Sequence, residues 1–302
     1  LALVGDAAVH LARGVLAGLG RFRGYSAYYM AENTLRFAAG VVLAVLGVAT
    51  AGPFGLVVGI APALALAFAI RGERDLASPG PPAPWGELSG AIGSLLLASV
   101  LTAFLLYAGP VAVELLADES ESGEASRFLA GLTIARVPVF LFQAVQAALL
   151  PKLSALAGAG RLREFRQRLG RLLVAVGAIA VAGVVGAFLL GPTIIELLFG
   201  ADFVIGRTDI ALLAVSSGAF MLAVALGQAL IALNGQSRVA IGWGTGVATF
   251  VVVTALGNDL LLRVELGLAV GSAVAAVVIG TMALLRLNRH LETEPHSLLA
   301  TE

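Results

Sequence analysis

Long apolar segments recur along the whole chain, and they constrain its fold more than any other feature of the sequence. Nine of them can be placed, at 1–20, 34–51, 54–70, 89–114, 127–150, 172–191, 209–233, 239–256 and 264–286. Most approach or reach the roughly 17–25 residues that a transmembrane helix needs. Charged residues make up only 13% of the chain and mean hydropathy is +0.97, whereas soluble domains carry about 25% charged residues. We therefore predict an all-α, polytopic transmembrane helix bundle with about nine membrane-spanning helices.

The charges in the connections alternate in sign, and this alternation predicts a topology. Basic residues follow the first, third, fifth, seventh and ninth segments, and acidic residues gather in the connections between them. The basic group is Arg21, Arg23, Arg71, Arg74, Lys152 to Arg171, Arg238, Arg286 and Arg289, and the acidic group is Asp118, Glu119, Glu121, Glu124, Glu196, Asp202 and Asp259. Short loops rich in Lys and Arg stay in the cytoplasm. We expect a multi-pass protein of the cytoplasmic (inner) membrane with a cytoplasmic C-terminus.

A proline-rich stretch at 72–88 divides the apolar segments into a group of three and a group of six. Prolines at this density exclude a regular helix, so we predict a linker at 76–88. It would join the C-terminal half of a first transmembrane lobe (1–75) to a second, six-helix lobe (89–290), and a cytoplasmic tail (291–302) would follow.

A weak internal match supports a repeat of lobes. The sequence LAGLGRFR at 16–23 aligns with IALNGQSR at 231–238 at three positions, which pairs the first segment with the seventh. If both lobes are six-helix repeats, the first lobe here is incomplete and lacks about three helices. The apolar run at the very start of the sequence fits the same expectation.

The fifth segment carries polar residues that are hard to place against lipid. Arg136, Gln143 and Gln146 lie along it on neighbouring faces, and an unpaired charge at membrane depth costs several kcal/mol. Pro138 predicts a bend, and Pro151 is expected to stop the helix. We predict that the three polar residues line a cavity. The alternatives are hydrogen bonds between helices for the glutamines, and snorkelling or a carboxylate partner for Arg136.

The stretch at 161–171, which follows this segment, has interleaved basic and apolar residues. That pattern is typical of an amphipathic helix on a membrane surface, so we expect it on the inner leaflet.

The first segment has a polar stripe of its own. Asp6, His10 and Arg13 are spaced by four and three residues, so they share one face of a helix. A local ion pair or an exposed helix end is one interpretation, and a hydrated face of a central cavity is the other. The repeat pairs Arg13 with Gln228 of the seventh segment, where helix packing is the simpler explanation. The predicted substrate-cavity residues are Arg136, Gln143, Gln146, Arg13, His10, Asp6 and Gln228.

Other kinds of site find little support in the sequence. The chain has no cysteine, and no His or carboxylate cluster has metal-ligand spacing, so we expect no metal, no cofactor and no nucleic-acid partner. The run with Gly242, Gly244 and Gly246 lacks the strand and the Lys-Ser/Thr of a phosphate loop. We expect these glycines to permit close contact between helices.

Several stretches of the sequence resemble one known family. They are RGVLAGLGRFRGYSAYYMAENTLR (13–36), the R-x-P helix that ends in ALLPKLS (148–154), and ELLFGADF (196–203). They resemble the polysaccharide-biosynthesis flippases, the O-antigen-type exporters of the multidrug/oligosaccharidyl-lipid/polysaccharide (MOP) superfamily. The resemblance implies a two-lobe, MOP/MATE-like architecture and a transporter without enzymatic activity.

The resemblance also implies the substrate and the partners. A polyprenyl-diphosphate-linked oligosaccharide would cross the membrane by alternating access, with membrane lipids and polysaccharide-assembly proteins as the other expected partners. We expect Arg13 and Arg136 to meet the diphosphate in a cavity between the lobes, and the glutamines to meet sugar hydroxyls.

Two other functions stay open from the sequence. An ion-coupled multidrug exporter of the same superfamily is the first, and a polytopic glycosyltransferase or ligase is the second. The short external loops at 115–126 and 192–208 hold no evident catalytic group, which disfavours the second. No nucleotide site is visible, so we expect coupling to an ion gradient, to the membrane potential or to consumption of the product. Asp6 is the only carboxylate inside the apolar segments, with Glu114, Asp209 and Glu265 at their outer ends.

Overall fold

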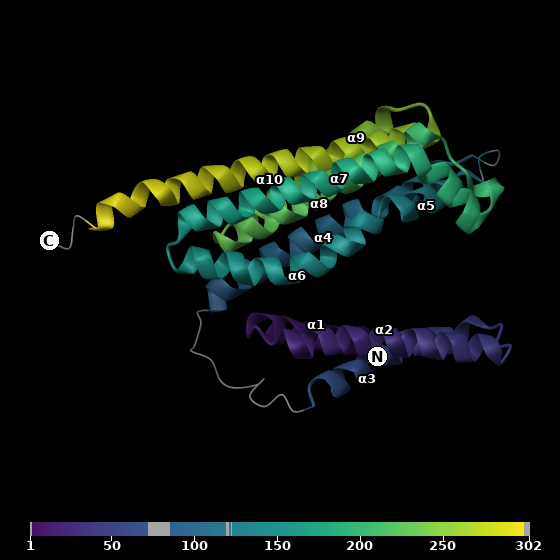
Figure 1. The fold of residues 1–302 in the computed structure, drawn as a ribbon, viewed down its shortest axis with the longest axis horizontal. Coiled ribbons are helices and arrows are strands. Elements are labelled where there is room, and N and C mark those ends of the chain that lie inside the picture. The colour runs from purple at the N-terminus through teal and green to yellow at the C-terminus, as the bar shows by residue number, and fades with distance from the viewer. Residues whose placement is uncertain (1, 72–84, 119–120, 122, 299–302) are drawn as a thin grey trace. The chain divides into compact units, whose positions relative to one another are not determined.

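The computed structural model describes residues 2–71, 85–118, 121 and 123–298, and in these ranges it contains helices joined by turns and irregular loops, with no strand (Figure 1). The prediction of an all-α protein is therefore confirmed. The helices are α1 (Ala2–Gly18), α2 (Phe22–Val45), α3 (Ala51–Ala69), α4 (Trp85–Leu116), α5 (Glu124–Ala135), α6 (Val137–Gly158), α7 (Leu162–Phe199), the short 3₁₀ helix η2 (Ala201–Phe203), α8 (Arg207–Ala232), α9 (Gln236–Leu256) and α10 (Leu260–Leu298).

Six of the described helices are long and apolar enough to cross a membrane, so the chain is a membrane protein. They are α3, α4, α7, α8, α9 and α10, and the bent pair α5–α6 would make a seventh. The length and composition of the described helices therefore do not confirm the predicted nine spans. The helix α1 has only 17 residues, and α2 begins well before the predicted start at 34 and includes Arg23, Glu32 and Arg36.

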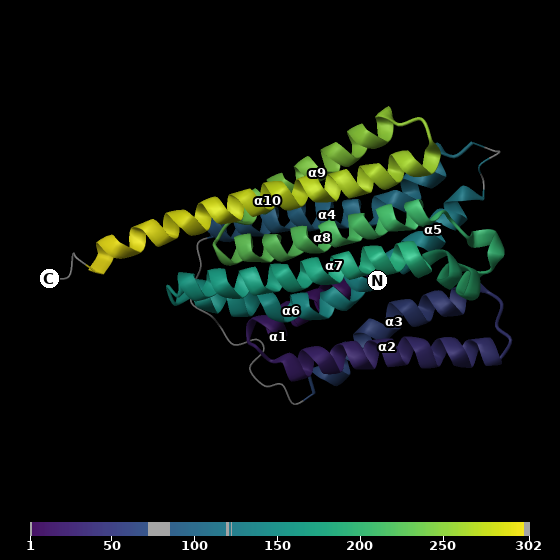
Figure 2. The same ribbon diagram turned by 45° about the horizontal axis from the view of Figure 1, so that its top comes forward.

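The chain divides into two compact units, Leu1–Pro82 (unit 1) and Ala83–Glu302 (unit 2). In unit 1, α3 packs against both α1 and α2 (Figure 2). Its small core contains Val9, Tyr28, Ala65 and Ala69. Much of the predicted linker at 76–88 lies outside the described residues, but α4 already begins at Trp85.

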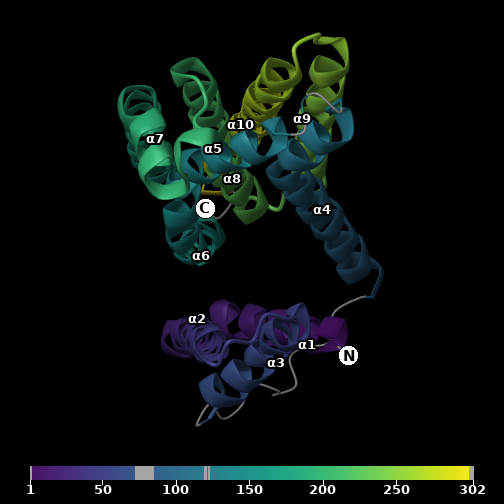
Figure 3. The same ribbon diagram turned by 90° about the vertical axis from the view of Figure 1, so that its right-hand side faces the viewer.

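Unit 2 is built around α8 and α10, which pack against each other. The view along the helices shows α6 and α7 on one side of this pair and α4 and α9 on the other (Figure 3). The helices α9 and α10 run in opposite directions, because Gly242 meets Ile279 at one level and Gly267 meets Thr254 at another. Small residues at these contacts allow the two backbones to approach closely.

One turn geometry closes four of the described helices, and Gly47 (φ 71°) supplies it between α2 and α3. In the α1–α2 turn Gly20 has φ 68°, and in the α8–α9 turn Asn234 has φ 60°. In each turn the N–H groups of this residue and of the next one donate to carbonyl oxygens near the end of the helix, as in a Schellman motif. The α6–α7 turn has the same two bonds, and Gly160 there has φ 68°.

The sequence LAGLGRFR (16–23) shares six of eight residues with LAGAGRLR (156–163). The turns place Gly20 in register with Asn234, whereas the match at 231–238 aligns Gly20 with Gly235. The shared turn therefore does not account for that match, and the repeat of lobes stays a prediction.

Two predictions about the region after the bend are wrong. The helix α6 does not stop at Pro151 but continues to Gly158, since membrane helices tolerate an internal proline. The amphipathic stretch at 161–171 is helical, yet it is the start of the 38-residue α7. Its apolar residues Phe165 and Leu169 are buried against other residues of unit 2, so protein, and not the inner leaflet, covers this face.

Candidate functional site

Arg136 lies at a break in the membrane-spanning pair α5–α6. It lies between Ala135, the last residue of α5, and Val137, the first residue of α6, and the two helix axes differ by 46° there. Pro138 explains the break, because it has no backbone N–H and its ring clashes with the carbonyl group four residues earlier. A β-carbon added to Gly183 of α7 would lie 3.5 Å from Cγ of Pro138, so the break packs on α7. The bend predicted from Pro138 is confirmed.

The side chain of Arg136 is half-buried, and two polar residues follow it on α6. Gln143 is exposed and Gln146 is half-buried. An exposed amide on a helix with many apolar residues is poorly suited to contact with lipid, since its hydrogen-bonding groups would have no partner there. These three residues are brought onto one bent helix pair, as the sequence predicted, and they form the candidate site of unit 2.

Arg13 of unit 1 is held by aromatic side chains. Its guanidinium carbon lies 4.5 Å from the ring centroid of Tyr29, 5.6 Å from that of Tyr28 and 5.9 Å from that of Tyr25. Its Nη2 donates a hydrogen bond to the hydroxyl oxygen of Tyr29. Cation–π contacts of this kind fix the position of a guanidinium group, so Arg13 ties α1 to α2.

The other predicted residues of the first and seventh segments lie in different surroundings. His10 is exposed on α1, and Gln228 is half-buried on α8. Asp6 belongs to α1, but its side chain lies outside the described residues. The structure therefore groups Arg136 with Gln143 and Gln146 in unit 2, and it places Arg13 and His10 in unit 1.

Two polar residues of α2 that the sequence did not predict lie next to the tyrosines that hold Arg13. Glu32 and Arg36 form an ion pair of 2.7 Å one turn apart. Tyr28 is fully buried, and burial, with a hydrogen bond to Glu32, raises the pKa of its hydroxyl group. The i, i+4 spacing of Glu32 and Arg36 indicates such an ion pair, but the predicted segment at 34–51 contains only Arg36.

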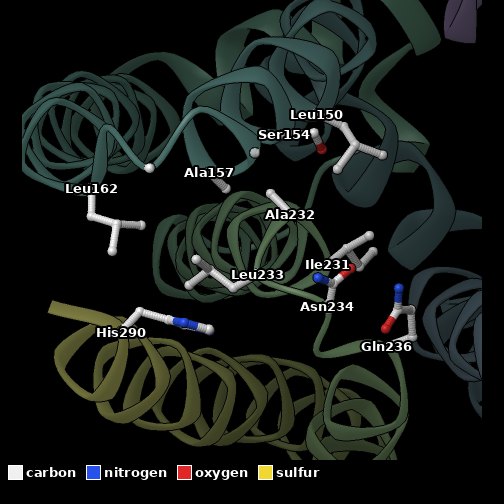
Figure 4. A pocket seen from close by; sticks show the side chains of 12 residues that line it. Leu150, Ser154, Ala157, Leu162, Ile231, Ala232, Leu233, Asn234, Gln236 and His290 are labelled. Atoms are coloured by element: carbon white, nitrogen blue, oxygen red, sulfur yellow. The ribbon is translucent and has the colours of Figure 1, made fainter. Parts of the chain in front are cut away.

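A cavity of about 620 Å³ opens at the end of unit 2 that is predicted to be cytoplasmic (Figure 4). The end of α6, the α8–α9 turn and α10 line it, with Ser154, Asn234, Gln236 and His290 as its polar side chains. Asn234 reaches it from the turn in which its backbone has positive φ. These groups could form hydrogen bonds with a polar ligand. None of the seven residues predicted for the substrate cavity lines this one.

Glu265 is a second feature that the sequence reasoning missed. Its side chain is 0% exposed, and neither carboxylate oxygen has a hydrogen-bond partner among the described residues. An ionised carboxylate buried in this way would cost several kcal/mol. The signal was its place in the apolar stripe of Leu261, Val264, Leu268 and Ala269, which predicts a residue that faces inward. The sequence alone places Glu265 only at the outer end of a segment.

No group of three or more His, Asp or Glu side chains in the described ranges is arranged to hold a metal ion. The candidate site offers groups that can bind a polar or anionic ligand. Arg136 can bind an anion, and the amides of Gln143 and Gln146 can donate to and accept from neutral polar groups.

Comparisons with known proteins find distant relatives that match most of this chain. The Mycobacterium tuberculosis protein named "Uncharacterized protein Rv1510" is 26% identical over 275 residues, which are 88% of this chain and 60% of that protein. "Uncharacterized protein Mb3654" of Mycobacterium bovis is 26% identical over 272 residues, 87% of this chain and 58% of that protein. The chain thus spans about three fifths of the length of these relatives. No protein-family model matches it, and no solved structure does.

Proposed function

We propose that the chain belongs to a flippase that moves a lipid-linked oligosaccharide, or a polysaccharide precursor, across the cytoplasmic membrane by alternating access. The observation that carries the proposal is the position of Arg136 at the break of α5–α6, with Gln143 exposed on the same bent pair. A cation and an amide on a membrane-spanning element need a polar partner, and a substrate that passes along this face supplies one.

The chemistry of these side chains fits a diphosphate attached to sugars. A guanidinium group binds phosphate oxygens through two parallel hydrogen bonds, which an ammonium group cannot do. The amides of Gln143 and Gln146 match sugar hydroxyls, while the lipid tail stays in the bilayer. Such contacts must be few, because a head group bound equally well in both states would not be released.

The helix arrangement of unit 2 also supports the proposal. Five of the apolar helices belong to this unit, and the bent pair α5–α6 brings the crossings to six. That is the number expected for one lobe of a MOP-type transporter. The break in α5–α6 supplies a hinge, since the two halves are joined only through Arg136 and can change their angle there.

The same superfamily offers a second candidate, an ion-coupled multidrug exporter. The buried carboxylate of Glu265 favours it, because carboxyl groups inside membrane bundles commonly bind and release ions or protons. The two candidates differ in substrate. A cationic drug would be repelled by Arg136, whereas a diphosphate would be attracted.

The experiment that tests the proposal replaces Arg136 in the full-length protein, with folding measured separately from transport. Arg136→Lys keeps the charge and loses the bidentate geometry, and Arg136→Ala removes both. We expect both variants to fold and both to flip a fluorescent lipid-linked oligosaccharide in proteoliposomes more slowly, with Arg136→Ala the slower. Arg166→Ala, which removes an exposed arginine of α7, should flip at the wild-type rate.

Two results would count against this role. If both Arg136 variants flip at the wild-type rate, Arg136 does not bind the head group. If Arg136→Ala unfolds while Arg136→Lys is normal in folding and flipping, Arg136 is a structural residue.

A further inference from the structure

The carboxyl group of Glu265 is isolated inside unit 2. It is 0% exposed and its two oxygens have no hydrogen-bond partner in the described part of the chain. The helices packed against α10 are α9, α8, α4 and α7. The residue is the sixth of α10, so its Cα lies only roughly 8 Å along the axis from the first residue of the helix.

Two acidic residues interact with this carboxyl group, Asp209 of α8 and Asp259 just before α10. Each already accepts a backbone hydrogen bond at a helix start, Asp209 from Gly206 and Asp259 from Leu262.

Arg207, at the start of α8, is exposed, and no basic group among the described residues is a hydrogen-bond partner of Glu265. Arg263, on the same turn, donates to the carbonyl oxygen of Leu116 at the end of α4. On α4 and α7, Glu114 and Glu196 are exposed. On α9 the charged residue is Arg238, near the opposite end of that helix.

We propose that Glu265 is a proton-binding site of this protein. In the packed arrangement the carboxyl group holds a proton, because a neutral acid is far less costly to bury than an unpaired anion. When the end of unit 2 formed by the α9–α10 turn opens, water reaches the group and the O–H proton passes to water, which leaves the carboxylate hydrated. The ligand of this site is the proton, which leaves when this end of unit 2 opens and binds again when it closes.

The site makes opening depend on pH. The packed state holds one proton more than the open state at pH values where a hydrated carboxyl group is ionised, so higher pH favours opening. One proton per event corresponds to a change of about tenfold in the opening equilibrium per pH unit over that range. A proton gradient could drive the transport proposed above in this way. That use rests on the proposed function, whereas the proton site rests on Glu265 alone.

The test is hydrogen–deuterium exchange of the full-length protein in lipid nanodiscs between pH 6 and pH 9, corrected for the intrinsic pH dependence of amide exchange. We expect peptides that cover 254–268 to lose protection as pH rises in the wild-type protein. The Glu265→Gln variant has a neutral side chain of the same shape at this position. The same peptides of this variant should stay protected at every pH. Glu196→Gln removes an exposed carboxyl group on α7 and should behave as the wild type.

Three results would overturn the proton site. They are wild-type protection that does not change with pH, the same change in Glu265→Gln as in the wild type, and protection that follows Na⁺ concentration instead of pH. Flipping in proteoliposomes is measured separately with an imposed pH difference. Wild-type flipping that responds to the gradient, with a Glu265→Gln variant that flips without responding, supports the use of the site in transport. Absence of flipping in the wild type would contradict the proposed function and leave the exchange result standing.

Discussion

Gly246 of α9 and Gly271 of α10 face each other with no room for a side chain on either. A β-carbon on Gly271 would lie 2.7 Å from the carbonyl oxygen of Gly246, and a β-carbon on Gly246 would lie 2.8 Å from that of Gly271. Both obstacles are backbone atoms, which cannot rotate away. The pair therefore sets the distance between α9 and α10, and α10 carries the buried Glu265.

We expect Gly271→Ala to destabilise unit 2, because the new β-carbon must push two helix backbones apart. Overpacking of this kind costs about 1–3 kcal/mol. Gly244→Ala is the matched control, since the nearest atom to its new β-carbon is Cδ1 of Leu101, 3.8 Å away. Thermal unfolding of the purified variants in detergent checks the prediction. Equal melting temperatures for the two variants would show that the close contact does not constrain the helices.

Phe165 tests whether protein or lipid covers the start of α7. Its side chain is fully buried against residues that include Leu153, Leu233 and Leu287, and removal of a buried Phe side chain costs about 3–5 kcal/mol. We expect Phe165→Ala to lower the melting temperature strongly, and Arg163→Ala, an exposed neighbour, to leave it unchanged. If Phe165→Ala keeps the wild-type melting temperature, the stretch at 161–171 lies against lipid after all.

The contact between Arg13 and Tyr29 makes a prediction about unit 1. Tyr29→Phe keeps the ring that faces the guanidinium group and removes the hydroxyl group that accepts its hydrogen bond. A hydrogen bond to a charged group is worth about 1.5–3 kcal/mol, so we expect a measurable loss of stability with flipping little changed. A large loss of flipping in a Tyr29→Phe variant of normal stability would instead place Arg13 on the substrate path.

The all-helical membrane bundle could be predicted from the sequence because long apolar segments leave the backbone no alternative in a membrane. The bend at Pro138 and the close contact at Gly242 and Gly246 were equally readable, since each depends on local chemistry. At Gly244 the local argument does not hold, because a β-carbon there meets only ordinary contact distances. Which glycine of a run faces a partner depends on packing.

The remaining features of the candidate site depend on tertiary contacts that the sequence does not display. Arg13 is three residues from His10, yet its partners are tyrosines of the next helix. Glu265 lies near a helix end, where charge is usually solvated, but neighbouring helices cover it completely. The similarity of 16–23 to 156–163 reflects a shared turn between two helices and not a similarity of whole membrane segments.

The central claim is that this protein moves a diphosphate-linked oligosaccharide through the membrane along a face that contains Arg136. The most direct measurement uses the full-length protein in proteoliposomes with a fluorescent polyprenyl-diphosphate oligosaccharide in one leaflet, and follows its appearance in the other. We predict protein-dependent flipping that Arg136→Ala slows and the control Arg166→Ala leaves unchanged. Flipping no faster than in protein-free vesicles, or transfer of the sugar to an acceptor by the protein alone, would contradict the claim.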